Sequence, residues 1–116
     1  YKSKDDEKIK IYFKIVDKMK NLIKNENTKL VIVYLPTEKY EFSKRGADLR
    51  KVKNQIFKEM NDRNIEIIDI ENSIKKNFIL PNVLYPKLIT GNHFNKRGYK
   101  FIASNITKYI NKNEKK

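Results

Sequence analysis

The chain has 116 residues, of which 39% are hydrophobic and 35% charged, a length and composition that fit one domain or part of one and exclude two independently folded domains. Its net charge of +13 favours a polyanionic partner, but only four of its 27 basic residues are arginine, the side chain best suited to nucleic-acid contacts. The absence of cysteine excludes a disulfide framework, and the longest wholly apolar run, residues 30–35, is too short to span a bilayer.

Residues 5–25 predict an amphipathic helix, because their apolar side chains recur at three- and four-residue steps, the spacing of one helical face. The predicted core face consists of Ile9, Tyr12, Ile15, Val16, Met19, Leu22 and Ile23. Ile11 and Phe13 fall outside this stripe, which suggests that the helix touches something on a second side.

A strand, a helix and a second strand follow. Residues 30–35 form a continuous β-branched and apolar run that ends at Pro36, the pattern of a strand buried on both faces of a parallel sheet. Residues 37–46 are polar and predict a loop. A helix over residues 47–61 then leads to a strand over residues 65–70. A right-handed crossover makes the two strands parallel, so the predicted fold class is α/β.

The rest of the chain predicts a helical turn at residues 71–77, an irregular segment at 78–92 and a last helix at 96–111. The core face of this last helix is predicted to carry Ile102, Ala103, Ile106 and Ile110. Two parallel strands alone leave exposed apolar edges. We therefore expect a missing N-terminal portion or a partner chain to complete the sheet.

His93, the single histidine, lies on a loop immediately before the last helix. Asn95 is a good N-cap for that helix, and Phe94 and Tyr99 occupy the two positions of a hydrophobic staple. These features fix the direction in which the loop enters the helix. A histidine held in this way at the carboxyl end of an α/β sheet suits proton transfer. An ordinary surface histidine remains the alternative.

The run His93-Phe94-Asn95, followed by Gly98-Tyr99 and Phe101-Ile102-Ala103, resembles the last conserved block of the SGNH (GDSL-type) hydrolases. In that family a histidine, often followed by asparagine two residues on, precedes a glycine and the final helix. The order of the upstream elements is also similar. The resemblance implies a three-layer, flavodoxin-like parallel sheet flanked by helices, of which residues 1–116 form a single domain or the C-terminal part of one.

The resemblance further implies an ester hydrolase or O-acyltransferase in which His93 takes a proton from a serine and later returns it to the leaving group. Such a reaction needs no cofactor. Thr90 stands where the family usually has the aspartate that orients the histidine. None of Ser3, Ser43, Ser73 and Ser104 has the context of the family's nucleophile, so this chain alone should not catalyse the reaction. The resemblance also suggests the cell envelope or another extracytoplasmic place.

Two alternatives stay open. The chain is a degenerate, inactive family member, or it is a non-catalytic basic module that binds nucleic acid or another acidic polymer. Lysine clusters for the second alternative are Lys51, Lys53 and Lys58, or Lys75 and Lys76, and Tyr40 and Phe42 could stack on bases. Because lysine, asparagine and isoleucine are abundant together, we interpret most of the positive charge as solvated surface. With one histidine and no cysteine, the sequence predicts no metal site.

Overall fold

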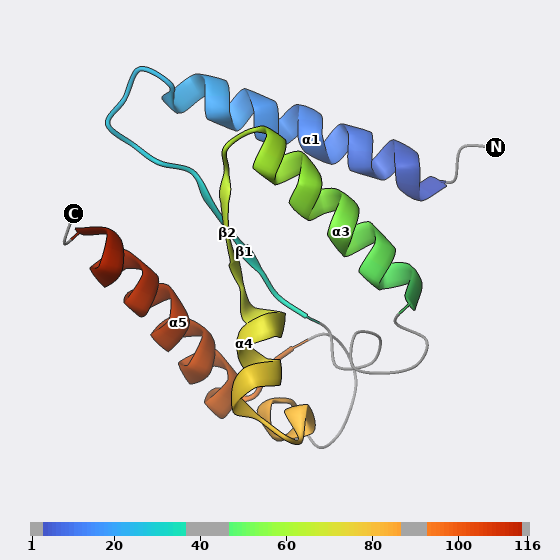
Figure 1. The fold of residues 1–116 in the computed structure, drawn as a ribbon, viewed down its shortest axis with the longest axis vertical. Helices are drawn as coiled ribbons and strands as arrows, with labels where there is room; N and C mark the ends of the chain where they lie inside the picture. The colour runs from blue at the N-terminus through green and yellow to red at the C-terminus, as the bar shows by residue number, and fades with distance from the viewer. Residues whose placement is uncertain (1–3, 37–46, 87–92, 115–116) are drawn as a thin grey trace.

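The computed structural model describes residues 4–36, 47–86 and 93–114 of the chain (Figure 1). The elements in chain order are α1 (Lys4–Ile23), β1 (Val31–Tyr34), α3 (Ala47–Asp62), β2 (Glu66–Asp69), α4 (Ile70–Asn77), the 3₁₀ helix η2 (Pro81–Leu84) and α5 (Lys96–Glu114). Each predicted helix and strand is present, with ends that differ by a few residues. The predicted loop at 37–46 lies outside the described residues. None of the described helices is long and apolar enough to cross a membrane.

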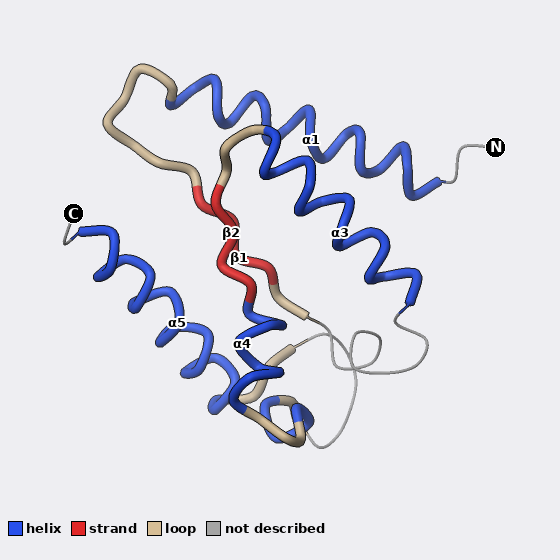
Figure 2. The backbone as a smooth tube through the Cα atoms, in the orientation of Figure 1, coloured by secondary structure: helices blue, strands red, loops and turns tan. Residues whose placement is uncertain are grey.

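β1 and β2 lie side by side as a parallel pair, as predicted, with Val31 opposite Glu66 and Tyr34 opposite Asp69 (Figure 2). Among the described residues these two strands are the whole sheet. The apolar side chains of both strands are therefore only partly buried, although the sequence predicts burial on both faces. A strand reaches full burial only when neighbours cover its edges as well as its faces.

Helices pack on both faces of the sheet, because successive strand residues point to opposite sides. Ile32 and Ile67 are directly opposite each other and face α1 and α3, where Phe13, Val16, Met60 and Ile65 form one buried cluster. Val33 and Ile68 pack against the second buried cluster, which α4, η2 and α5 contribute. Figure 1 shows α3 and α5 on opposite sides of the strand pair. The second cluster consists of Ile70, Ile74, Leu84, Tyr85, Phe94 and Ile102.

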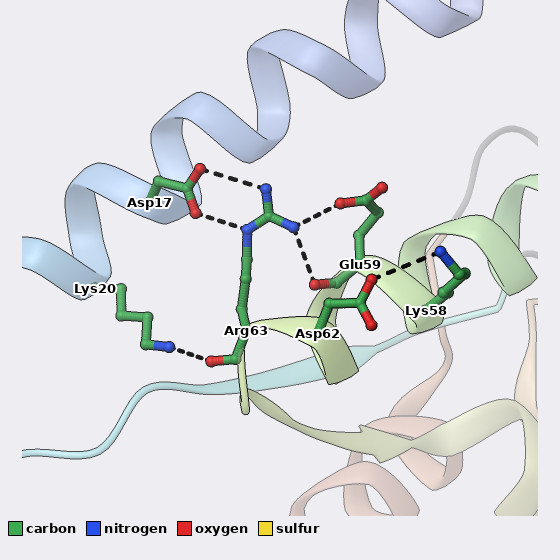
Figure 3. A network of polar contacts seen from close by, with 6 residues as sticks. All are labelled: Asp17, Lys20, Lys58, Glu59, Asp62 and Arg63. Carbon is green, nitrogen blue, oxygen red and sulfur yellow. Dashed lines mark hydrogen bonds and ion pairs between the residues drawn. The ribbon is translucent and has the colours of Figure 1, made fainter.

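The predicted core face of α1 is wrong in part. Phe13 is buried together with Val16, whereas Tyr12, Ile15, Met19 and Leu22 are exposed. The reason is the turn after α3, which holds α1 in one rotation (Figure 3). The Arg63 guanidinium lies 4.5 Å from the centre of the Phe13 ring, and its Nε donates to Asp17 Oδ1 at 2.6 Å. These contacts turn the Phe13 side of the helix inward.

The predicted core face of α5 is also wrong in part. Ile102 is buried and Ile106 packs against the same cluster, as predicted, but Ala103 and Ile110 are exposed. Phe101 takes part instead, and its ring meets that of Phe78 edge-to-face at 5.0 Å. Gly98 at the start of α5 is buried as well. The buried face of α5 is thus rotated toward the side that carries Gly98 and Phe101.

Candidate functional site

His93 lies three residues before the start of α5, and its side chain is exposed. It makes no hydrogen bond or ion pair with another described residue. An exposed imidazole is accessible to a group that comes within hydrogen-bond distance of it. Its usefulness as a catalytic group depends on how firmly the neighbouring residues hold the backbone.

Asn95 fixes the backbone two residues after His93. Its Oδ1 accepts a hydrogen bond from the Gly98 backbone N–H at 2.9 Å, which confirms the predicted N-cap. Its Nδ2 donates to the carbonyl oxygens of Val83 at 2.8 Å and Tyr85 at 3.1 Å. Its backbone N–H donates to the Leu84 carbonyl at 2.8 Å. One residue therefore joins the start of α5 to η2.

Phe94 ties the same loop to the carboxyl end of β1. Its ring lies 6.0 Å from that of Tyr99 in an edge-to-face contact, which confirms the predicted staple. On its other side it stacks on Tyr85 at 4.7 Å. The Tyr85 hydroxyl donates to the carbonyl oxygen of Pro36, two residues beyond β1, at 3.1 Å. This chain of contacts holds the His93 backbone near the carboxyl edge of the sheet.

Gly98 allows this close packing of α5 against η2. A Cβ atom at Gly98 would lie 2.5 Å from the Leu84 carbonyl oxygen and 2.8 Å from the Phe94 side chain. Both distances are shorter than real carbon contacts, so a larger residue would push α5 away from the His93 loop. Gly98 is thus required because the backbones of α5 and η2 approach each other closely at this position.

The other predicted site residues are not brought to His93 by the described residues. Thr90, at the position of the usual aspartate, lies outside them, as do Ser3 and Ser43. Ser104 is exposed on α5, and Ser73 lies in α4. The residues that the structure describes contain no group of three or more side chains able to hold a metal ion.

Sequence reasoning missed a buried polar cluster at the carboxyl end of β2. Lys53 of α3, with a side chain only 13% exposed, lies 3.0 Å from Asp69 Oδ2 and 2.9 Å from Glu71 Oε1. Its ammonium also lies 4.9 Å from the ring centre of Tyr34. Lys75 reaches the same Glu71 oxygen at 3.0 Å. Only two carboxylates indicated this cluster in the sequence. One is at the last residue of β2, and the other follows two residues later.

These contacts shift the pKa of Lys53. Burial alone would lower it, but the hydrogen bonds to Glu71 and Asp69 and the attraction of both carboxylates outweigh burial, so the pKa is raised above 10.5. Lys53 is therefore charged at neutral pH and engaged inside the protein. It does not contribute to the basic surface predicted for Lys51, Lys53 and Lys58, although Lys51 and Lys58 are exposed.

A groove of about 430 Å³ opens between α1 and α3. Asp17, Glu59 and Arg63 are among its lining residues, and His93 is not. The groove and the histidine are therefore separate features of the molecule. A comparison of the chain with models of known protein families gave no match, and neither curated proteins nor solved structures gave one.

Proposed function

We propose that this chain carries the histidine end of an SGNH-type active site, which hydrolyses an ester or transfers an O-acyl group. The observation that supports the proposal most is the hold on the His93 backbone. Asn95 caps α5 and binds η2, while Phe94 stacks on Tyr85, whose hydroxyl reaches the end of β1. A histidine in such a segment supports the proposal, because α/β folds place their reacting groups at the carboxyl edge of the parallel sheet.

In this mechanism His93 accepts the proton of a serine hydroxyl as the oxygen attacks the carbonyl carbon of an ester. It then returns the proton to the oxygen of the leaving alcohol, and the acyl group passes to water or to another hydroxyl. The serine and the oxyanion donors come from polypeptide beyond residues 1–116. The group that orients the imidazole is Thr90 or a neighbouring backbone carbonyl, in place of the usual carboxylate.

The proposal includes a complete three-layer sheet. Helices already cover both faces of the β1–β2 pair, which is the arrangement that further parallel strands would extend. A parallel sheet needs such cover on both faces. The partial burial of every residue in β1 leaves apolar surface for those strands.

The test uses the polypeptide extended toward its N-terminus by its native coding sequence. We expect a fluorophosphonate probe to label a serine in the extended protein, and His93→Ala to slow labelling by about 10²–10⁴-fold, the usual contribution of a general base. Ser104→Ala is the matched control, because Ser104 is an exposed serine in α5. It should leave labelling unchanged.

His93→Ala should fold normally, because the side chain is exposed and bonds to no other described residue. Its melting temperature should match that of the unsubstituted protein, so slower labelling reports on chemistry. The proposal is wrong if the folded, extended protein takes no label, or if His93→Ala takes label at the normal rate.

A basic binding module is the second candidate, supported by the net charge of +13. Lys51 and Lys76 are exposed and could contribute, whereas Lys53 is held by Asp69 and Glu71. This candidate predicts retention on heparin or DNA at low salt and a steep loss of binding as salt rises. No retention at low salt would remove it.

A further inference from the structure

The segment that joins α4 to α5 begins with an apolar turn, residues 78–84, whose middle is exposed. Ile79 is 97% exposed and Leu80 63%, and Val83 is 37% exposed. In Figure 1 this turn directly follows α4, at the lower end of the molecule. Single exposed apolar side chains are ordinary on a protein surface, but adjacent ones with a polar rim mark an interaction surface.

Contacts at both ends fix the shape of the apolar turn. The Phe78 backbone N–H donates to the Ile74 carbonyl oxygen at 2.9 Å, where α4 ends. The Phe78 ring meets that of Phe101 in α5 edge-to-face at 5.0 Å. Leu84, at the other end of the turn, is fully buried. The exposed side chains between these anchors are therefore held outward before any partner binds, which lowers the entropy cost of binding.

Basic side chains lie on two sides of the apolar turn. Lys76, in the last turn of α4, is exposed three residues before Ile79. Arg97 of α5 is also exposed, and its guanidinium lies 5.4 Å from the centre of the Phe78 ring. Lys100 is exposed about one helical turn further along α5. None of these three cations forms an ion pair with another described residue, so their charge is available to an external anion.

The distribution of acidic residues leaves this positive charge uncompensated. Of the 14 aspartates and glutamates in the chain, none lies between Glu71 and Glu114, a stretch that contains eight lysines and arginines. Glu71 is itself buried, and Lys53 and Lys75 both bond its carboxylate. The apolar turn and α5 therefore belong to the part of the sequence that attracts anions most strongly.

From this combination we propose that the apolar turn and the start of α5 dock the protein on an anionic lipid surface. Ile79 and Leu80 enter the apolar zone beneath the headgroups, while Lys76, Arg97 and Lys100 contact the lipid phosphates. A small apolar insertion or a basic patch alone holds a protein weakly, but the two together give stable attachment. Binding to the phosphates of a nucleic acid would use the cations and leave both apolar side chains in water.

The first test is sedimentation of the protein with vesicles. Vesicles of equal parts phosphatidylglycerol and phosphatidylcholine should bind the protein at low salt, whereas phosphatidylcholine alone should not. Ile79→Ser together with Leu80→Ser should weaken binding at least about tenfold, because the apolar burial in lipid is lost. Both side chains are exposed in the free protein, so this variant should fold normally. Leu22→Ser is the matched control, since Leu22 is a 78% exposed leucine of α1, and it should leave binding unchanged.

A second pair of variants tests the basic rim of the apolar turn. Lys76→Gln together with Lys100→Gln should weaken vesicle binding at least about tenfold, because both cations lie near the lipid surface. Lys18→Gln together with Lys51→Gln is the matched control. It removes the same charge from exposed positions of α1 and α3, and it should weaken binding less than about threefold because salt screens distant charges.

A tryptophan reports directly on insertion, because the sequence contains none. The fluorescence of Ile79→Trp should shift to shorter wavelength when the protein binds phosphatidylglycerol vesicles, and lipids with brominated acyl chains should quench it. Leu22→Trp should show neither change, since α1 stays in water.

The proposal is overturned if the protein does not bind the phosphatidylglycerol vesicles, or if the two serine substitutions leave binding unchanged. An unshifted emission of vesicle-bound Ile79→Trp would also overturn it, because attachment would then rest on charge alone. Retention on heparin or DNA without vesicle binding would favour the basic binding module instead. The outcome is separable from the active-site proposal, because His93→Ala should bind vesicles normally whether or not a serine takes the fluorophosphonate label.

Discussion

Lys53 is a charged residue that the structure places inside the protein, between two acidic side chains. Its ammonium bonds Asp69 and Glu71, and the Glu71 side chain is only 4% exposed. A buried carboxylate that loses its cation keeps the cost of desolvation without the compensating attraction. The Lys53 ammonium should therefore contribute more to stability than an exposed lysine does.

Replacement of Lys53 by methionine should lower the free energy of unfolding by about 2 kcal/mol at neutral pH, less than for a fully broken buried pair because Lys75 still reaches Glu71. Urea unfolding followed by circular dichroism measures this. Lys58→Met is the control on the same helix, since Lys58 is exposed and pairs with Asp62 at 3.6 Å. It should have little effect. An equal loss of unfolding free energy in Lys53→Met and Lys58→Met would contradict the stabilising role of the buried Lys53 ion pairs.

The same contact predicts a pH dependence. The folded-state pKa of Lys53 lies above the ordinary value of 10.5, so the folded protein keeps this proton to higher pH than the unfolded chain does. The stabilisation is fully present below pH 10.5 and is lost as the pH rises through the folded-state pKa. The difference in unfolding free energy between the unsubstituted protein and Lys53→Met should narrow above that pH. If this difference in unfolding free energy stayed constant as the pH rises, the predicted loss of stabilisation at high pH would be wrong.

At this scale the candidate site was partly predictable. The N-cap role of Asn95 and the Phe94–Tyr99 staple follow from spacings of three and five residues, and both are confirmed. The partners of Asn95 and Phe94 in and just after η2 were not predicted, because Val83 and Tyr85 precede Asn95 by 12 and 10 residues across an irregular segment. The catalytic role of His93 stays a prediction.

Among the elements, α1 depends most on one distant side chain. Arg63 holds it through Asp17, which lies 46 residues away in sequence, and the arginine also bonds Glu59 of α3. The Arg63 hydrogen bond is the largest influence on the pKa of Asp17, and together with the attraction of Arg63 and Lys20 it outweighs desolvation and lowers this pKa below 3.8. The planar guanidinium can serve both carboxylates at once, which a lysine ammonium cannot do with the same geometry.

Arg63→Lys should loosen α1 while the rest of the fold remains. We expect hydrogen exchange in α1 to become about tenfold faster, with little change in α5, because local opening of one element need not unfold the others. Lys58→Ala is the control, since its ion pair with Asp62 lies within α3. Unchanged exchange in α1 would show that packing of Phe13 and Val16 alone holds the helix.

For the whole molecule, the net charge of +13 is the dominant long-range term. Like charges at this density repel one another and destabilise the compact state, and salt screens this repulsion. Raising sodium chloride from about 0.05 M to 0.5 M should therefore raise the melting temperature, by an amount on the order of a few degrees. Thermal unfolding followed by circular dichroism measures the shift.

Exposed lysines provide the control for this prediction. Lys51→Gln and Lys76→Gln together should reduce the salt effect, because both side chains are exposed and contribute to the repulsion. A melting temperature that falls with salt would mean that the ion pairs of Lys53, Lys29 and Arg63 outweigh the net charge.

The sequence by itself determined the order of helices and strands, the parallel pairing of β1 with β2 and the capped start of α5. Each follows from interactions over a few residues or from the handedness of one crossover. Only the tertiary structure decided which face of α1 is buried and why Lys53 is internal. The first depends on the contact of Arg63 with Asp17, 46 residues apart, and the second on the contacts of Lys53 with Asp69 and Glu71, 16 and 18 residues apart. No local pattern specifies these contacts.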